Sequence, residues 1–326
     1  MILRQVVSMF DATRSLQLLA LGIIIASCAP SEDGAPAEDM AAEESRPGVM
    51  NVVARGLSFA EAPSEVPAGW TTLHFANESD VVHFAIVERL PEGQSLASQQ
   101  AQIAPVFQDG MDFLSEGDAD AAVARFGELP PWFGEIVFMG GPGLTSPGHE
   151  SDATIFLEPG TYLLECYVKT NGIFHSYNPD PDMYGMVHEF TVTSDTTAVS
   201  EPTADVDITI SSTDGIQVAG DVGTGARTVA VHFQDQVAHE NFVGHDVHLA
   251  RLDADDDLAT LEAWMNWTAP AGLQTPAPVE FVGGLNEMPA GSTGYFDVTL
   301  SPGRYAWVAE VPGSLEKGML QEFAIR

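Results

Sequence analysis

One cysteine, two histidines and a methionine have the types and the order of a soft-metal site. Cys166 ends a segment with alternating apolar residues, and His175 follows it after eight intervening residues. His83 lies far upstream, and Met186 follows His175 after ten residues. Two imidazoles, a thiolate and a weak thioether suit both oxidation states of copper. Side chains of these types suit copper, provided that the fold brings them together.

Cysteine use strengthens this interpretation. The 326-residue chain has two cysteines, Cys28 and Cys166. Cys28 closes the apolar segment Leu16–Ser27, and Ile25-Ala26-Ser27-Cys28 resembles the lipobox of bacterial lipoproteins. The resemblance implies removal of residues 1–27, a lipid on Cys28, and a lipid-anchored place in the cell envelope, either in the periplasm at the outer membrane or at the cell surface. A plain signal peptide or a single helical anchor is the alternative. Cys166 then has no intramolecular partner, and metal ligation explains an unpaired thiol in an oxidising compartment.

Two runs around these residues carry a resemblance to a family. Gly160-Thr161-Tyr162-Leu163-Leu164-Glu165-Cys166, followed by His175 and Gly185-Met186, resembles the closing hairpin of cupredoxins. Asn77-Glu78-Ser79-Asp80-Val81-Val82-His83 resembles the turn that leads to that family's first histidine ligand. The resemblance implies a β-sandwich holding one type I copper. Its ligands would be His83, Cys166, His175 and Met186.

The spacing of the ligands departs from the family in one place. Ten residues separate His175 from Met186, where the family has two to four. The surplus run from Tyr177 to Asp182 is an apparent insertion, and Met183 is an alternative axial ligand. If copper is not bound, Cys166 is a small buried residue of a cupredoxin-like sandwich.

The elements that position these residues occur twice in the chain. Motifs matched between the halves include Phe138-Met139-Gly140-Gly141 with Phe281-Val282-Gly283-Gly284, and Pro159-Gly160 with Pro302-Gly303. Short alternating segments between such turns predict an all-β fold of two tandem cupredoxin-like antiparallel β-sandwiches of Greek-key type. The predicted divisions are an acidic flexible tether at 28–48, a first domain at 49–194, a linker at 195–204 and a second domain at 205–326. A helical insertion is expected at about 92–131, and a shorter helix at 258–267.

The second half lacks the ligand set. Ala309 stands where Cys166 stands, and nothing matches His175. His239, His245 and His248 would point to different faces if their segment is extended. We therefore expect them to be hydrogen-bonded or exposed rather than to share a metal with Glu240 or Glu310.

The net charge and the identity of residue 165 narrow the classes of function that the protein can have. The formal net charge of −35 excludes nucleic-acid binding. The leading hypothesis is an electron-transfer or copper-handling protein, anchored to a membrane through Cys28 and serving a redox partner protein. The alternative is a metal-free interaction module of the cell envelope. A nitrite-reductase-like or multicopper-oxidase-like enzyme is disfavoured, because Glu165 stands where the resemblance implies a histidine that connects two copper centres.

Overall fold

The computed structural model describes residues 48–177 and 185–326. These described residues form one compact unit. The predicted leader at 1–27, the lipidation site Cys28, the tether and the alternative ligand Met183 lie outside the described residues. Among the described residues, no helix is long and apolar enough to span a membrane.

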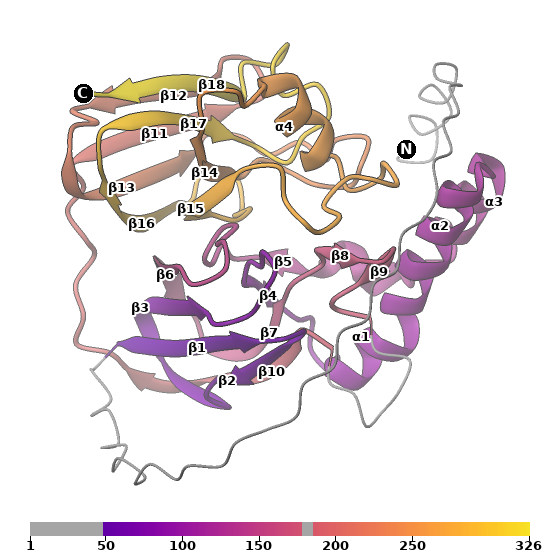
Figure 1. The fold of residues 1–326 in the computed structure, drawn as a ribbon. Helices are drawn as coiled ribbons and strands as arrows, with labels where there is room; N and C mark the ends of the chain where they lie inside the picture. The colour runs from indigo at the N-terminus through magenta and orange to yellow at the C-terminus, as the bar shows by residue number, and fades with distance from the viewer. Residues whose placement is uncertain (1–47, 178–184) are drawn as a thin grey trace, which may run out of the picture. The chain divides into compact units, whose positions relative to one another are not determined.

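The first half is a sandwich of short strands (Figure 1). Its longest strand, β3, belongs to both layers: Glu65–Ala68 pairs with β10, whereas Gly69–Asn77 pairs with β1 and β6. Alternate side chains of β3 are buried, as the period of a half-buried strand requires. The strands are β1 (Val49–Arg55), β2 (Ser58–Glu61), β3 (Glu65–Asn77), β4 (Ile86–Arg89), β5 (Val137–Phe138), β6 (Glu150–Leu157), β7 (Gly160–Glu165), β8 (Lys169–Thr170), β9 (Ile173–Phe174) and β10 (Val187–Thr196).

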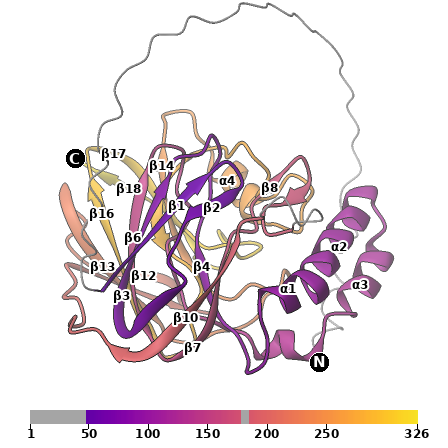
Figure 2. The same cartoon turned by 90° about the horizontal axis from the view of Figure 1, so that it is seen from below.

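The helical insertion is confirmed and has three α-helices and a short 3₁₀ segment. These are α1 (Leu96–Gln102), α2 (Ala104–Glu116), α3 (Ala119–Phe126) and the segment Pro131–Glu135. The side chains of Ser95 and Asp118 accept hydrogen bonds from the first turns of α1 and α3. Gly117 ends α2 with φ of 81°, a conformation that glycine adopts without a steric penalty. The helices lie together at one side of the strands in both ribbon views (Figures 1 and 2).

The second half repeats the sandwich. It contains β11 (Val206–Ser211), β12 (Gly215–Gly220), β13 (Gly225–Phe233), β14 (Val247–Leu252), β15 (Glu280–Leu285), β16 (Thr293–Leu300), β17 (Gly303–Val308) and β18 (Leu320–Ile325). One layer has the order β12-β11-β13-β16 and the other β15-β14-β17-β18. The expected shorter helix is α4 (Leu258–Met265). Antiparallel pairs dominate both halves, but β1 with β3, β3 with β10, and β11 with β13 are parallel.

A strand pair joins the two halves. β6 and β16 are antiparallel neighbours, with Ala153 opposite Phe296, so one layer of each half continues into the other. Trp70 of β3 packs edge to face against Tyr295 of β16, with ring centroids 5.6 Å apart. This shared sheet explains why both halves belong to one compact unit.

The matched glycine motifs have one backbone conformation. Gly141 has φ of 103° and Gly284 has φ of 130°. A Cβ on Gly141 would lie 2.2 Å from the carbonyl oxygen of Ala85, and one on Gly284 would lie 2.3 Å from that of Val247. Both positions therefore require glycine for the same two reasons, close approach and positive φ. The repeat read from the sequence is a repeat of backbone geometry.

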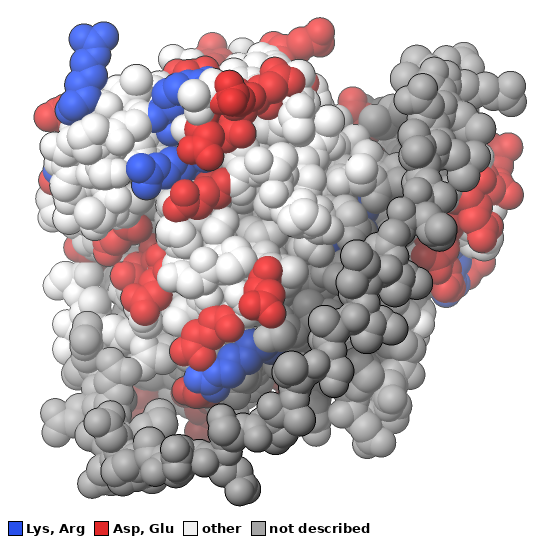
Figure 3. All heavy atoms as spheres, viewed as in Figure 1, with Lys and Arg blue, Asp and Glu red and all other residues white. Residues whose placement is uncertain are grey.

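Among the charged side chains on the face drawn in Figure 3, acidic ones outnumber basic ones. In the face drawn in Figure 3, Asp and Glu are spread over both halves, and Lys and Arg are fewer. The pattern agrees with the formal net charge of −35, which repels polyanions.

Candidate metal centre

Three of the four predicted ligands converge. Cys166 Sγ lies 3.6 Å from His83 Nδ1 and 3.9 Å from His175 Nδ1, and the two Nδ1 atoms are 3.1 Å apart. All three side chains are buried. Residues 83 and 166 are far apart in sequence, so the sandwich itself creates this cluster.

Backbone hydrogen bonds hold the three residues in place. His83 lies in the loop between β3 and β4, where its N–H and carbonyl both pair with Thr145. Cys166 follows β7, and its N–H donates to the carbonyl of Met186. The N–H of Met186 in turn donates to the carbonyl of His175. These bonds fix the relative positions of the ligand loops without using the ligand atoms.

Asn77 explains the turn that precedes His83. Its side-chain amide donates to the carbonyls of Val81 and Thr145, and its Oδ1 accepts from the N–H and the hydroxyl of Ser79. Because Asn77 is buried, these bonds also satisfy polar groups that burial would otherwise leave unpaired.

The cluster has the dimensions of a trigonal metal site. With metal–nitrogen bonds of about 2.0 Å and a metal–sulfur bond of about 2.3 Å, a trigonal ion sets nitrogen–sulfur edges of about 3.7 Å and a nitrogen–nitrogen edge of about 3.5 Å. The observed edges of 3.6, 3.9 and 3.1 Å are close to these values. One small ion can therefore contact all three ligand atoms.

The histidines present the right nitrogens. His83 Nε2 donates to the carbonyl of Gly56 at 3.0 Å, which leaves the lone pair on Nδ1 facing the cluster. His175 Nε2 is hydrogen-bonded to the Thr170 hydroxyl at 2.8 Å. Sequence reasoning missed Gly56 and Thr170. Thr170 lies inside the Cys166–His175 loop and was a readable candidate, but no sequence pattern marks a backbone carbonyl such as that of Gly56.

Burial sets the protonation of the metal-free cluster. It lowers the pKa of His83 to about 4, and burial followed by the neighbouring His83 lowers the pKa of His175 to about 3. Burial also raises the pKa of the Cys166 thiol to about 12. The imidazoles are thus neutral and ready to bind a metal at neutral pH, whereas the thiol must lose a proton. This donor set and its geometry fit copper.

The chain was also compared with known proteins. No family model matches the sequence, and no curated protein is significantly similar to it. Among solved structures, the chain is similar to auracyanin A, a "blue" copper protein from Chloroflexus aurantiacus, with 23% identity over 45% of this chain and 100% of that chain, at a TM-score of 0.27. It is also similar to a copper-containing nitrite reductase from Thermus scotoductus, with 12% identity over 85% of this chain and 61% of that chain, at a TM-score of 0.22. The fold is cupredoxin-like.

The backbone of Met186 lies next to the cluster. Its side chain is fully buried, and its backbone bonds join it to both Cys166 and His175. The long interval before Met186 is therefore compatible with a methionine beside the cluster. Ligation by its sulfur stays a prediction.

The second half covers the His175 loop. The hydroxyl of Thr170 pairs with that of Thr275 at 2.8 Å, and the backbone of Lys169 pairs with Leu273 and Thr275. The buried Lys169 Nζ donates to the carbonyls of Trp267 and Ala269. Residues of both halves thus fix the ligand loop, and His175 is 3% exposed.

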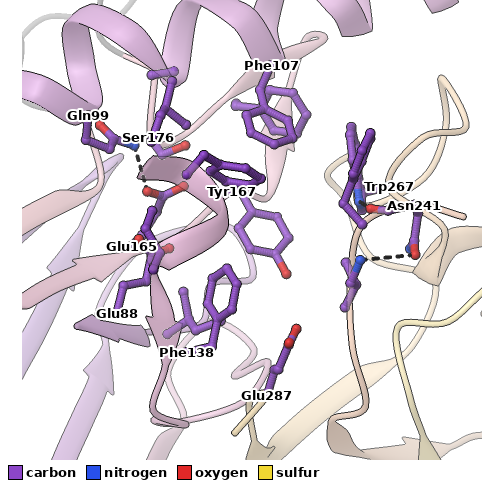
Figure 4. Close-up of a pocket in the computed structure, with 18 residues that line it drawn as sticks. Glu88, Gln99, Phe107, Phe138, Glu165, Tyr167, Ser176, Asn241, Trp267 and Glu287 are labelled. Carbon is purple, nitrogen blue, oxygen red and sulfur yellow. Dashed lines mark hydrogen bonds between the residues drawn. The ribbon is translucent and has the colours of Figure 1, made fainter. Parts of the chain in front are cut away.

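A small pocket adjoins the cluster (Figure 4). It has a volume of about 80 Å³ and lies between the helical insertion and the second half, with Phe107 and Trp267 in its walls. Glu165 points into this pocket and accepts a hydrogen bond of 2.7 Å from Gln99. Burial raises the pKa of Glu165 to about 7. Glu165 therefore points into the pocket, where Gln99 is its hydrogen-bond partner.

The second half has a polar network in place of a copper site. His248 Nδ1 accepts from the N–H of Leu144, so His248 Nε2 donates to Asp246, whose other oxygen accepts from the N–H of Glu310. Asp246, His248 and Glu310 have side-chain ligand atoms within 4.8 Å of one another, but both nitrogens of His248 are already used. The expectation of a hydrogen-bonded histidine is confirmed for His248.

The expectation based on an extended segment is wrong for the other two histidines. Residues 234–246 form an irregular loop, and β14 begins only at Val247. The loop brings the rings of His239 and His245 to a centroid separation of 5.3 Å. Because the segment is not a strand, its side chains do not alternate between two faces.

Proposed function

We propose that the first half binds one copper ion through His83, Cys166 and His175, with Met186 as the axial ligand. The convergence of the three buried ligand atoms carries this proposal. When bound, copper supplies a one-electron couple. The protein holds the ligands rigidly through the backbone bonds of Cys166 and Met186, so little rearrangement accompanies a change of oxidation state.

Electron transfer or copper handling fits the burial of the site better than catalysis does. The ligands are covered on the His175 side by Thr275 and neighbouring residues, which keeps substrates from the metal. Glu165 supplies a hydrogen-bonded carboxyl group at the position where a second copper would need an imidazole. A partner protein would then exchange electrons or copper with the site across the protein surface.

The proposed cellular setting is a lipid anchor at Cys28. Lipidation there would keep the protein at the cell envelope, in reach of a membrane-bound or periplasmic redox partner. The motif Ile25-Ala26-Ser27-Cys28 supports this part of the proposal.

Copper titration with visible absorption tests the central proposal. We expect the full chain to take up one Cu(II) per molecule and to develop an intense thiolate-to-copper band. A chain that binds no copper and stays colourless would overturn the proposal and favour the metal-free interaction module.

A further inference from the structure

The second half contains polar atoms that the fold buries and leaves without partners. Within residues 48–177 and 185–326, four buried side-chain atoms lack a hydrogen bond: His239 Nε2, Glu240 Oε2, His245 Nε2 and Glu310 Oε1. Three of them belong to one loop between β13 and β14. Buried polar groups are almost always satisfied, so such a group calls for a ligand or a water.

The tautomer of His245 shows what kind of ligand this is. The side chain of His245 is completely buried, and its Nδ1 donates to the carbonyl of Asp235 at 3.1 Å. A carbonyl only accepts, so Nε2 of the neutral ring carries the lone pair. Metal-bound histidines are oriented by this kind of bond, and His83 makes the equivalent one to Gly56. A buried, unpaired imidazole lone pair attracts a metal ion or the hydrogen of a water.

The two rings are spaced for a shared ion. Two imidazoles on one tetrahedral ion, with metal–nitrogen bonds near 2.0 Å, have ring centroids about 5 Å apart. The centroids of His239 and His245 are 5.3 Å apart, and those of the copper pair His83 and His175 are 4.9 Å apart. Burial also lowers the pKa of His239 to about 4, so that its ring is neutral at pH 7.

We propose that His239 and His245 bind a first-row divalent cation of the zinc type through their Nε2 atoms, with water completing the shell and the charge of the adjacent Glu240 favouring the cation. Two imidazoles without a thiolate suit Zn²⁺. Glu240 Oε2 is buried, and it lies 3.9 Å from Lys317 Nζ without a hydrogen bond. The site is separate from the copper cluster and does not depend on it.

Zinc binding by the full chain carrying Cys166→Ser tests this site, because the serine removes the thiolate of the first half. Calorimetric titration with Zn²⁺ alone should show one equivalent that His239→Ala and His245→Ala each weaken at least about 100-fold. Glu240→Gln, which keeps the shape of the side chain, should weaken binding less, because it removes a neighbouring negative charge and not a ligand. His232→Ala is the matched control, since both nitrogens of His232 are already hydrogen-bonded on β13.

Either of two results would contradict the zinc site. Unchanged zinc affinity in both His239→Ala and His245→Ala, or no zinc uptake by the Cys166→Ser chain, would overturn the proposal and leave a bound water as the partner of these atoms. Circular dichroism checks that each variant is folded. If His245→Ala does not fold, His239→Ala decides, because His239 is only partly buried in its loop. A failure of copper binding in the first half would leave the zinc result unaffected.

Discussion

The two halves use one backbone frame for different side chains. In the first half the N–H of Cys166 donates to the carbonyl of Met186 at 3.0 Å, and in the second the N–H of Ala309 donates to that of Met319 at 2.9 Å. The loop that follows Cys166 returns His175 to the cluster, but the loop after Ala309 has no histidine. The same backbone arrangement therefore accommodates both sets of residues. A few side chains decide whether a thiolate metal site exists.

The second half also contributes to the first. Thr275 and Leu273 bind the loop that carries His175, and the shared sheet at β6 and β16 holds the halves in register. The second half lacks a thiolate site, but it supports the loop that carries His175 in the first half. Variants at equivalent positions of the two halves should therefore have different effects on copper binding.

The largest difference in copper absorption is expected between serine at position 166 and serine at the equivalent position 309. Cys166→Ser should abolish the blue band and leave the fold intact, because the thiol is a small buried group and its thiolate is the source of the colour. Ala309→Ser should leave the band unchanged. Visible absorption and copper content measure both. A blue Cys166→Ser protein would remove Cys166 from the site.

Paired glycine variants should destabilise both halves but affect copper in one. Gly141→Ala and Gly284→Ala each force a Cβ against a carbonyl at positive φ, which we expect to cost about 2 to 4 kcal/mol in the free energy of unfolding. Gly141→Ala should also weaken copper binding, because the carbonyl it displaces belongs to Ala85, two residues after His83.

Urea unfolding and copper titration of the glycine variants measure the two effects. Gly93→Ala is the control, since its φ is 82° with no heavy atom within 4 Å of the new Cβ. It should cost only about 1 to 2 kcal/mol. Equal loss of copper affinity in Gly141→Ala and Gly284→Ala would show that the halves are not independent in this respect.

Methionine variants give a finer contrast. Met186→Leu should keep the colour but raise the reduction potential, since an axial thioether tunes the metal more than it holds it. Met319→Leu should change neither property. Visible spectroscopy measures the colour, and redox titration measures the reduction potential. An unchanged potential in Met186→Leu would point to Met183 or to a site without an axial ligand.

The smallest expected signal is the number of protons released when copper binds. At pH 5.5 the buried imidazoles, with pKa values of about 4 and 3, are already neutral, whereas the thiol with its pKa of about 12 is protonated. Cu(II) uptake should therefore release about one proton, where histidines of ordinary pKa would raise the total to nearly three. Calorimetry in buffers of different ionisation enthalpy counts them. A count near three would mean that the imidazoles are not buried in the metal-free protein.

The amino-acid sequence alone determined the ligand types, the repeat and the main elements. Alternation along β3 predicted a half-buried strand, and the polar and apolar pattern after Ser95 predicted helices. His83, Cys166 and His175 were found because the short runs that contain them resemble cupredoxin motifs. These features depend on neighbours in the chain, so they can be read from spacing.

Tertiary structure alone decided the rest. The pairing of β6 with β16, the bond from Thr170 to Thr275 and the bond from Gln99 to Glu165 join residues dozens to more than a hundred positions apart. The adjacency of His239 and His245 arises because their segment is a loop, which alternation along a strand could not predict. Such contacts are set by how buried surfaces pack and which polar groups must be satisfied, and neither is encoded in local spacing.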